Sequence, residues 1–121
     1  MAQYLELRHR AIEHALQESA PDRIVELGAG LSRRGVTWAA GRGTEYFEVD
    51  LPHMIEAKRA AIGRAPAALR SRIADRLHHA AIDVLSPGFS EWLSQTLTGA
   101  ERPVVVAEGL LGYFVLAERA A

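Results

Sequence analysis

Apolar side chains along this chain follow two spacings, one typical of helices and one typical of strands. Phe89, Leu93 and Leu97 recur every fourth residue, which places them on one face of an amphipathic helix. The unbroken apolar run at 104–107 is instead typical of a strand buried on both faces of a parallel sheet. Proline and glycine separate such segments and indicate turns. The chain is therefore predicted to alternate helices with short strands.

This alternation predicts a specific order of elements. We expect strands at 23–27, 46–49, 79–82 and 104–107, and helices at 4–17, 33–40, 52–62 and 89–97. The Ala- and Arg-rich stretch at 63–76 allows a second short helix, which Gly63 and Pro66 interrupt. Strands separated by helices imply right-handed crossovers. The predicted fold class is α/β, a Rossmann-like parallel sheet with helices on both faces.

Composition narrows the classes of protein that fit this chain. Its 121 residues suffice for one domain, and 49% apolar with 24% charged residues is typical of a globular protein. The lack of cysteine excludes disulfides and thiolate zinc sites. A net charge of -1 gives no bulk attraction to nucleic acid, and no apolar run approaches the roughly 20 residues of a membrane span. We expect a cytoplasmic protein that binds neither nucleic acid nor membrane.

Carboxylates stand at or near the ends of all four predicted strands. Ligands of open parallel sheets bind beyond these strand ends. Acidic residues also favour the first turns of helices, so each one alone has an equally good structural explanation. Four together favour a ligand site. The positions are Glu26, Glu48 with Asp50, Asp83, and Glu108.

The loop after the first strand carries the most informative motif. Gly28 and Gly30 allow the backbone to approach a ligand closely, beside the N–H groups of a helix start. A dinucleotide-binding fingerprint has a third glycine where this chain has Arg33, which weakens an NAD interpretation and counts against tight helix–strand packing. Glu26, just before the loop, would repel a phosphate but suits an ammonium or sulfonium group.

Two further carboxylates suit the other parts of a nucleoside. Asp50 lies 20 residues after Gly30, at a strand end where an acidic side chain accepts hydrogen bonds from a ribose diol. Asp83 ends the third strand and can accept a hydrogen bond from an adenine amino group. A ribose, an adenine and a cation, without a phosphate cradle, describe S-adenosylmethionine better than NAD.

Three segments of the chain together resemble the signature motifs of class I S-adenosylmethionine-dependent methyltransferases. They are V-E-L-G-A-G-L-S at 25–32, F-E-V-D-L-P at 47–52 and A-E-G-L-L-G-Y at 107–113. More narrowly, they resemble the leucine carboxyl methyltransferase and polyketide O-methyltransferase group, which has an L-G-A-G-L-D-x-R loop, an E-V-D-x-P strand end and an E-G-x-x-x-Y segment. The resemblance extends from about Tyr4 to Tyr113.

The resemblance implies a set of cofactor contacts. Arg8 matches an arginine that holds the cofactor carboxylate, although a solvated arginine on a helix face explains it equally well. Glu108 matches an acidic residue near the methionine moiety, and Asp83 with Val84 matches the adenine contact. Ser32 stands where the family usually has Asp, which puts the role of that Asp in doubt. The predicted cofactor-binding residues are Arg8, Glu26, Gly28, Gly30, Asp50, Asp83, Val84 and Glu108.

The resemblance also predicts what the chain lacks. A complete class I domain has seven strands, and only the first four are found here; the helical lid of the family has no counterpart before Tyr4. We expect a truncated domain rather than a natural half-domain. Without the later strands, residues 104–107 would form an apolar sheet edge, which predicts a homo-oligomer.

Two functions from different classes remain. The first is an S-adenosylmethionine-dependent methyltransferase, acting by O-methyl transfer to a small molecule or carboxylate, or its cofactor-binding half. Such transfer depends mainly on orienting the reactants, so no catalytic base is assigned. The second is a non-catalytic Rossmann-like half-domain that serves as an assembly module.

Two pairs of adjacent residues have simpler explanations than a functional site. His78 and His79 lie in a predicted strand and therefore point to opposite faces, which argues against a metal site. Arg33 and Arg34 begin a predicted helix, where they could meet an anion, but a solvated helix face is the expected environment.

Overall fold

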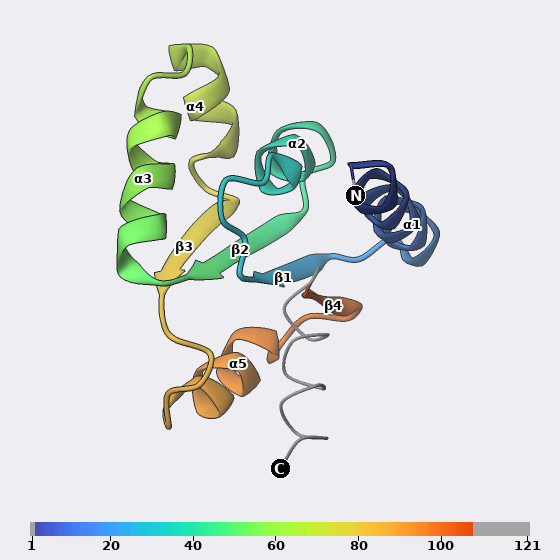
Figure 1. Ribbon diagram of the computed structural model, residues 1–121, viewed down its shortest axis with the longest axis vertical. Helices are drawn as coiled ribbons and strands as arrows, with labels where there is room; N and C mark the ends of the chain where they lie inside the picture. The colour runs from blue at the N-terminus through green and yellow to red at the C-terminus, as the bar shows by residue number, and fades with distance from the viewer. Residues whose placement is uncertain (1, 108–121) are drawn as a thin grey trace.

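The computed structural model describes residues 2–107, with side chains from residue 9 onward, and its elements follow the predicted order (Figure 1). The helices are α1 (Ala2–Ser19), α2 (Arg34–Gly41), α3 (Pro52–Gly63), α4 (Ala67–Ile73) and α5 (Phe89–Leu97). The strands are β1 (Arg23–Leu27), β2 (Glu45–Asp50), β3 (Leu77–Ala81) and β4 (Pro103–Val106). Strand β3 begins two residues earlier than predicted, and the second short helix forms as α4 once Pro66 has ended the turn after α3.

The four strands form one parallel sheet in the order β3-β2-β1-β4. The chain first moves from β1 outward to β3 and then returns to place β4 on the other side of β1. Because crossovers between parallel strands are right-handed, this reversal moves the connecting helix to the opposite face of the sheet. Figure 1 shows α1 to α4 above the sheet and α5 below it. The predicted α/β architecture is confirmed.

Alternating strand residues supply a separate apolar core on each face of the sheet. The core above the sheet joins α1, α2 and α4 to the strands through Leu16, Trp38, Tyr46 and Ile73, each at most 3% exposed. The core below the sheet packs three strand residues against the apolar face of α5, namely Val25, Leu27 and Val49. None of the helices within residues 2–107 is long and apolar enough to cross a membrane.

The fourth strand differs from its prediction. Val106 is buried, but Val104 is only half-buried and Val105 is 40% exposed. Within residues 2–107, β4 has a neighbouring strand on one side only. The expectation of burial on both faces is therefore wrong for the described sheet, because an unbroken apolar run does not reveal which strand lies at an edge.

Helix α2 approaches the sheet closely through a glycine that the dinucleotide fingerprint does not include. A Cβ added at Gly35 would lie 2.8 Å from Oε2 of Glu48 and 3.0 Å from Cδ1 of Tyr46. Arg33, at the third glycine position of the fingerprint, is exposed. The missing glycine at position 33 therefore does not keep the helix from the strands, since Gly35 provides a close approach two residues later.

We expect Gly35→Ala to lower the free energy of unfolding by about 1–3 kcal/mol, because the added methyl overpacks against a buried, hydrogen-bonded side chain. Gly41, at the end of the same helix, has no atom within 4 Å of an added Cβ. Gly41→Ala should therefore stabilise the protein by about 0.5–1 kcal/mol through helix propensity. Urea denaturation of both variants checks the pair, and equal effects of the two changes would contradict this packing.

Candidate functional site

The glycine loop (residues 28–33) connects β1 to α2 at the carboxyl edge of the sheet. Gly28 and Gly30 have φ angles of 65° and 53°, in the left-handed region that side chains with a Cβ disfavour. The N–H groups of Gly28 and Ala29 both donate to the carbonyl of Val49, at 2.8 and 3.2 Å. The loop therefore lies against the end of β2 instead of extending into solvent.

Asp50 is the residue that joins this loop to the second strand end. Its Oδ2 accepts a hydrogen bond from the Gly30 N–H at 2.8 Å, and its Oδ1 accepts one from the Leu51 N–H at 2.8 Å. The side chain remains partly exposed. The structure thus brings together the two strand ends that the sequence predicted to share a ligand, and leaves a carboxylate accessible beside them.

Asp83 and Val84 continue this row of strand ends. The N–H of Ile82 donates to the carbonyl of Asp50 at 3.0 Å, which ties the end of β3 to the end of β2. Asp83 is exposed, and its Oδ1 accepts a hydrogen bond from the Leu85 N–H at 2.9 Å. Val84 is half-buried against the core below the sheet. An adenine contact at these two residues stays a prediction.

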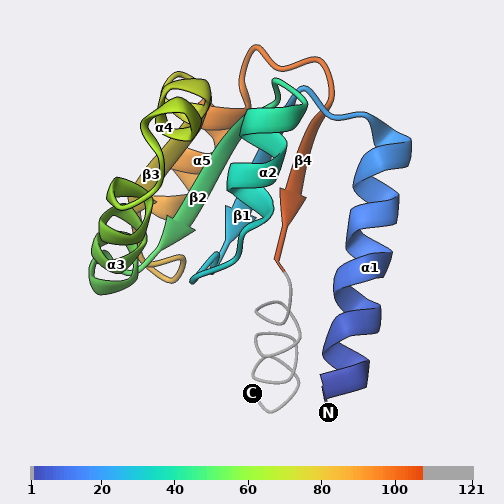
Figure 2. The same cartoon turned by 90° about the horizontal axis from the view of Figure 1, so that it is seen from above.

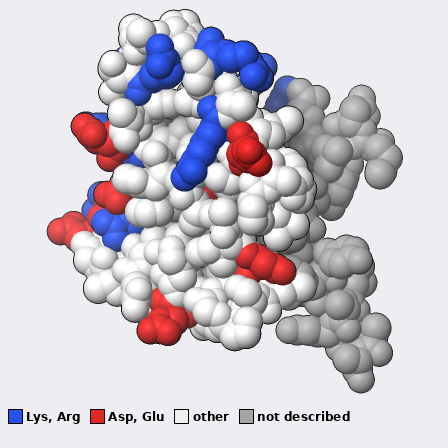
Figure 3. Space-filling model, turned by 90° about the vertical axis from the view of Figure 1, so that its left-hand side faces the viewer, with Lys and Arg blue, Asp and Glu red and all other residues white. Residues whose placement is uncertain are grey.

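Large apolar side chains are exposed beside the same strand ends. Leu31, Leu51 and Leu85 follow β1, β2 and β3 and are 65%, 40% and 72% exposed. Figure 3 views the molecule from the side on which β2 and β3 end, where uncharged side chains form most of the visible surface. Basic side chains gather at the top of this view, over the α3–α4 end. An edge of this composition suits a flat apolar ring with polar substituents.

Glu26 is placed differently from the other predicted site residues. Its side chain points to the face covered by α2 and is 3% exposed. Its Oε1 accepts a hydrogen bond from the Tyr46 hydroxyl at 2.6 Å, and its Oε2 lies 3.5 Å from Nη1 of Arg34. Both oxygens thus have partners inside the protein, and contact with a ligand stays a prediction.

Burial raises the pKa of the Glu26 carboxyl, and the hydrogen bond from Tyr46 and the charge of Arg34 only partly oppose this. A raised pKa in the folded state makes the native protein bind the proton more tightly than the unfolded chain does. This residue's contribution to the free energy of unfolding therefore falls as the pH rises from the ordinary glutamate pKa through the raised one.

We expect Glu26→Gln to remove this decline. The difference in free energy of unfolding between the variant and the wild-type protein should shift in favour of the variant across that pH range. Urea denaturation at a series of pH values measures it. A difference that does not change with pH would show that Glu26 titrates alike in the folded and unfolded chain.

Arg8 and Glu108 are the predicted site residues of which least is described. Glu108 lies outside the described residues, and for Arg8 only the backbone, within α1, is described. Figure 2 shows that the N-terminal end of α1 lies on the side toward which the strands point. Arg8 belongs to the N-terminal half of this helix, and its contact with the cofactor stays a prediction.

Arg34 was expected on a solvated helix face, and that prediction is wrong. Its side chain is fully buried, with Nε donating to Oε1 of Glu13 at 2.7 Å and Nη2 lying 2.8 Å from Nδ1 of His9. Arg33 beside it is exposed, as predicted. Arg34 thus ties α1 to α2 and to Glu26 on the sheet, a role that long-range contacts decide.

The two adjacent histidines point to opposite faces, as predicted. The ring of His78 stacks on Phe47 with centroids 4.6 Å apart, while Nε2 of His79 lies 2.9 Å from Oε1 of Glu48. Glu48 is fully buried and also pairs with Lys58 at 2.7 Å. Sequence reasoning assigned no role to Lys58. The i,i+2 spacing of Glu48 and Asp50 indicated only that these two side chains share one face of the sheet.

Ser32 occupies the position at which the resembled family has Asp. Its hydroxyl oxygen accepts a hydrogen bond from the Arg34 N–H at 3.2 Å, which satisfies a donor in the first turn of α2. A carboxylate can accept the same bond. Ser32 therefore pairs one N–H group at the start of this helix, while the N-cap residue itself, Arg33, makes no side-chain cap bond.

The residues at this edge fit an adenosyl group that bears a positive charge. Asp50 offers carboxylate oxygens for hydroxyl donors, and an added Cβ at Gly30 would have only the Met54 methyl within 4 Å, at 3.7 Å. The residues that follow β2 and β3 supply carboxylates and leucines rather than cations. These acceptors and apolar side chains suit a ribose, a flat base and a sulfonium better than a pyrophosphate.

Comparisons with known proteins concern the family and the fold of the chain. A family model described as leucine carboxyl methyltransferase matches residues 1–121. The structure is similar to the methyltransferase domain of bacterial CtHen1-CN, with a TM-score of 0.56 and 16% identity over 84% of this chain and 50% of that chain. It is also similar to the glycopeptide N-methyltransferase MtfA, with a TM-score of 0.45 and 26% identity over 62% of this chain and 33% of that chain. No curated protein sequence matches the chain.

The similarity to the CtHen1-CN domain shows the fold alone, a Rossmann-like sheet with helices on both faces. This chain spans about half the length of that structure, 50% of it.

Proposed function

The chain belongs to the leucine carboxyl methyltransferase family, and from this premise we propose that it binds S-adenosylmethionine at the carboxyl edge of its sheet for O-methyl transfer to a small molecule or a carboxylate. The observation that carries this proposal is the 2.8 Å hydrogen bond from the Gly30 N–H to Asp50. It joins a glycine loop able to approach a ligand closely to a carboxylate able to accept from a ribose diol.

Every predicted contact except Glu26, which is engaged with Tyr46 and Arg34, has a task in this proposal. Asp50 accepts from the ribose hydroxyls, and Asp83 with Val84 meets the adenine, beside the exposed leucines of the edge. Gly28 and Gly30 leave room for the cofactor along the loop. Arg8 and Glu108 are assigned to its carboxylate and its methionine moiety by family resemblance.

The bound cofactor supplies an electrophilic methyl group on a sulfonium. The protein's own work is then to hold the acceptor in line with that methyl group and to exclude water. A carboxylate acceptor is already deprotonated near neutral pH, so it needs no general base. Glu26 and Glu48, the buried acids nearest the site, are both engaged inside the protein, and neither is assigned a catalytic role.

Isothermal titration of the protein with S-adenosylhomocysteine tests the proposal, with NADH as the comparison ligand. We expect saturable binding of the first at micromolar concentration and much weaker binding of the second. If S-adenosylhomocysteine does not bind even at millimolar concentration, the result would instead favour the alternative, a Rossmann-like half-domain that acts as an assembly module.

A homo-oligomer is a further proposal, supported by the exposed side of β4. Val105 is 40% exposed there, and β4 has a strand neighbour only on the β1 side within residues 2–107. Unpaired strand edges tend to pair with another chain. Light scattering coupled to size exclusion should give a mass above that of one chain, and a stable monomer at micromolar concentration would contradict this.

A further inference from the structure

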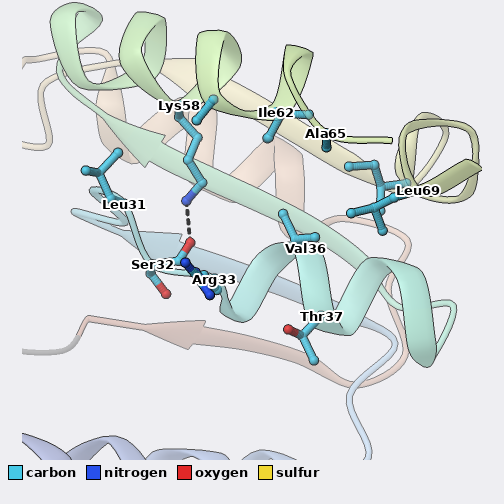
Figure 4. A pocket seen from close by; sticks show the side chains of 11 residues that line it. Leu31, Ser32, Arg33, Val36, Thr37, Lys58, Ile62, Ala65 and Leu69 are labelled. Carbon is cyan, nitrogen blue, oxygen red and sulfur yellow. Dashed lines mark hydrogen bonds between the residues drawn. The ribbon is translucent and has the colours of Figure 1, made fainter. Parts of the chain in front are cut away.

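Lys58 on α3 is the only lysine of the chain, and it is 4% exposed. Its Nζ donates to Oε2 of Glu48 at 2.7 Å, to the carbonyl of Gly30 at 3.3 Å and to the carbonyl of Ser32. Figure 4 shows this side chain reaching from α3 across the cavity between α2 and α3–α4 to the carbonyl of Ser32. An ammonium has three donors, and here each has an acceptor.

The carboxylate that pairs with Lys58 is itself held in place. Glu48 is fully buried, and Oε1 lies 2.9 Å from Nε2 of His79 on β3. Gly35 of α2 lies over its other oxygen with no side chain between them. The position of the lysine is therefore fixed by β2, β3 and α2 together, independently of the loop that it contacts.

The lysine and Asp50 act on the same residue from two sides. Asp50 accepts from the Gly30 N–H, while Lys58 donates to the Gly30 carbonyl. In a planar trans peptide the carbonyl and the following N–H point in opposite directions. The carbonyls of Gly30 and Ser32 point toward Lys58 on α3, so the N–H groups of Leu31 and Arg33 point the other way. On that side of the loop they can donate hydrogen bonds to a ligand.

Resting on the function proposed above, we propose that Lys58 is a positioning residue, which holds the glycine loop in its cofactor-binding conformation before the cofactor arrives. A preorganised loop does not lose conformational freedom on binding, so affinity is higher than for a mobile one. The cavity between α2 and α3–α4, of about 520 Å³, is lined by Leu31, Ser32 and Arg33 of the loop, and Lys58 is the side chain on this side that binds the loop's carbonyls.

The double variant Lys58→Met with Glu48→Gln tests this, with the wild-type protein as its control. Either substitution by itself would leave a buried charge without its partner and could unfold the protein, whereas removing both charges of a buried pair is often tolerated. The glutamine oxygen can still accept a hydrogen bond from the His79 ring. A difference confined to the glycine loop therefore reports on the lysine and its bonds to the loop carbonyls.

We expect amide hydrogen exchange at residues 28–33 of the ligand-free double variant to be about tenfold faster than in the control, and exchange in β1 and β2 to be unchanged. The dissociation constant for S-adenosylhomocysteine should rise by about tenfold, which corresponds to about 1.4 kcal/mol. A loop that exchanges at the control rate would overturn the proposal, and so would faster exchange spread evenly over the sheet.

The two readouts separate this inference from the proposed function. Faster loop exchange in the double variant upholds the positioning role even if the wild-type protein binds no S-adenosylhomocysteine, and only the function then fails. Tight cofactor binding that is equal in the double variant and the control upholds the function and overturns the positioning role.

Discussion

Replacing Asp50 with alanine should weaken binding of S-adenosylhomocysteine by about a hundredfold, the largest change in affinity that we expect from one substitution. Hydrogen bonds to a charged group contribute about 1.5–3 kcal/mol each, and a ribose diol can donate two. The variant also removes the acceptor of the Gly30 N–H, so the glycine loop loses its contact with β2 at that residue. Both effects act in the same direction.

Asp50→Asn separates the two effects. An amide oxygen can still accept from the Gly30 N–H, but the negative charge is lost, so we expect an intermediate loss of affinity, on the order of tenfold. Asp75, an exposed aspartate just before β3 at the opposite edge of the sheet, provides the control. Asp75→Ala should bind as the wild-type protein does, and calorimetry that finds Asp50→Ala equally unaffected would remove the ribose assignment.

Arg34→Met should lower the free energy of unfolding by about 3–5 kcal/mol, the typical cost of removing one partner from a buried charge cluster. The guanidinium is fully buried between Glu13, which is 27% exposed, and Glu26, which is 4% exposed. Without it, the carboxylate of Glu26 keeps the Tyr46 hydrogen bond but loses the guanidinium that lies 3.5 Å from its Oε2. α1 also loses its polar tie to α2. The urea midpoint measures this change.

The neighbouring arginine offers a matched control for the same helix turn. Arg33 is exposed, and Arg33→Met should change the free energy of unfolding by no more than about 0.5 kcal/mol. The two substitutions are chemically identical, so the difference between them isolates burial and ion pairing. Equal effects would show that the contacts of Arg34 with Glu13 and Glu26 do not contribute to stability.

The elements of the fold could be predicted because their signals are local. The spacing of Phe89, Leu93 and Leu97 predicted the apolar face of α5, which packs on the core below the sheet. The turn signals predicted most element boundaries to within two residues. The burial of β4 was overestimated, since Val105 is exposed. A run of valines has the same sequence pattern whether its strand lies at the centre or at the edge of a sheet.

The residues of the candidate site could be predicted where a residue type suited to a ligand stands at the end of a strand. Gly28, Gly30 and Asp50 are ends of neighbouring parallel strands, and such ends share one edge in any sheet of this type, so the sequence was enough to bring them together. Glu26 was chosen by the same reasoning, but its side chain points toward α2 and is bonded to Tyr46.

By itself, the sequence determined the parallel α/β sheet and the edge at which a ligand would bind, because hydrophobic period, glycines and strand-end acids are each encoded within a few neighbouring residues. Only the tertiary structure decided that Arg34 is buried and that Lys58 binds the glycine loop through bonds 28 and 26 residues apart in sequence. A side chain's partner in such a contact depends on how helices cross the sheet. The way in which each helix crosses the sheet is set by the packing of the whole domain, and no local sequence pattern determines it.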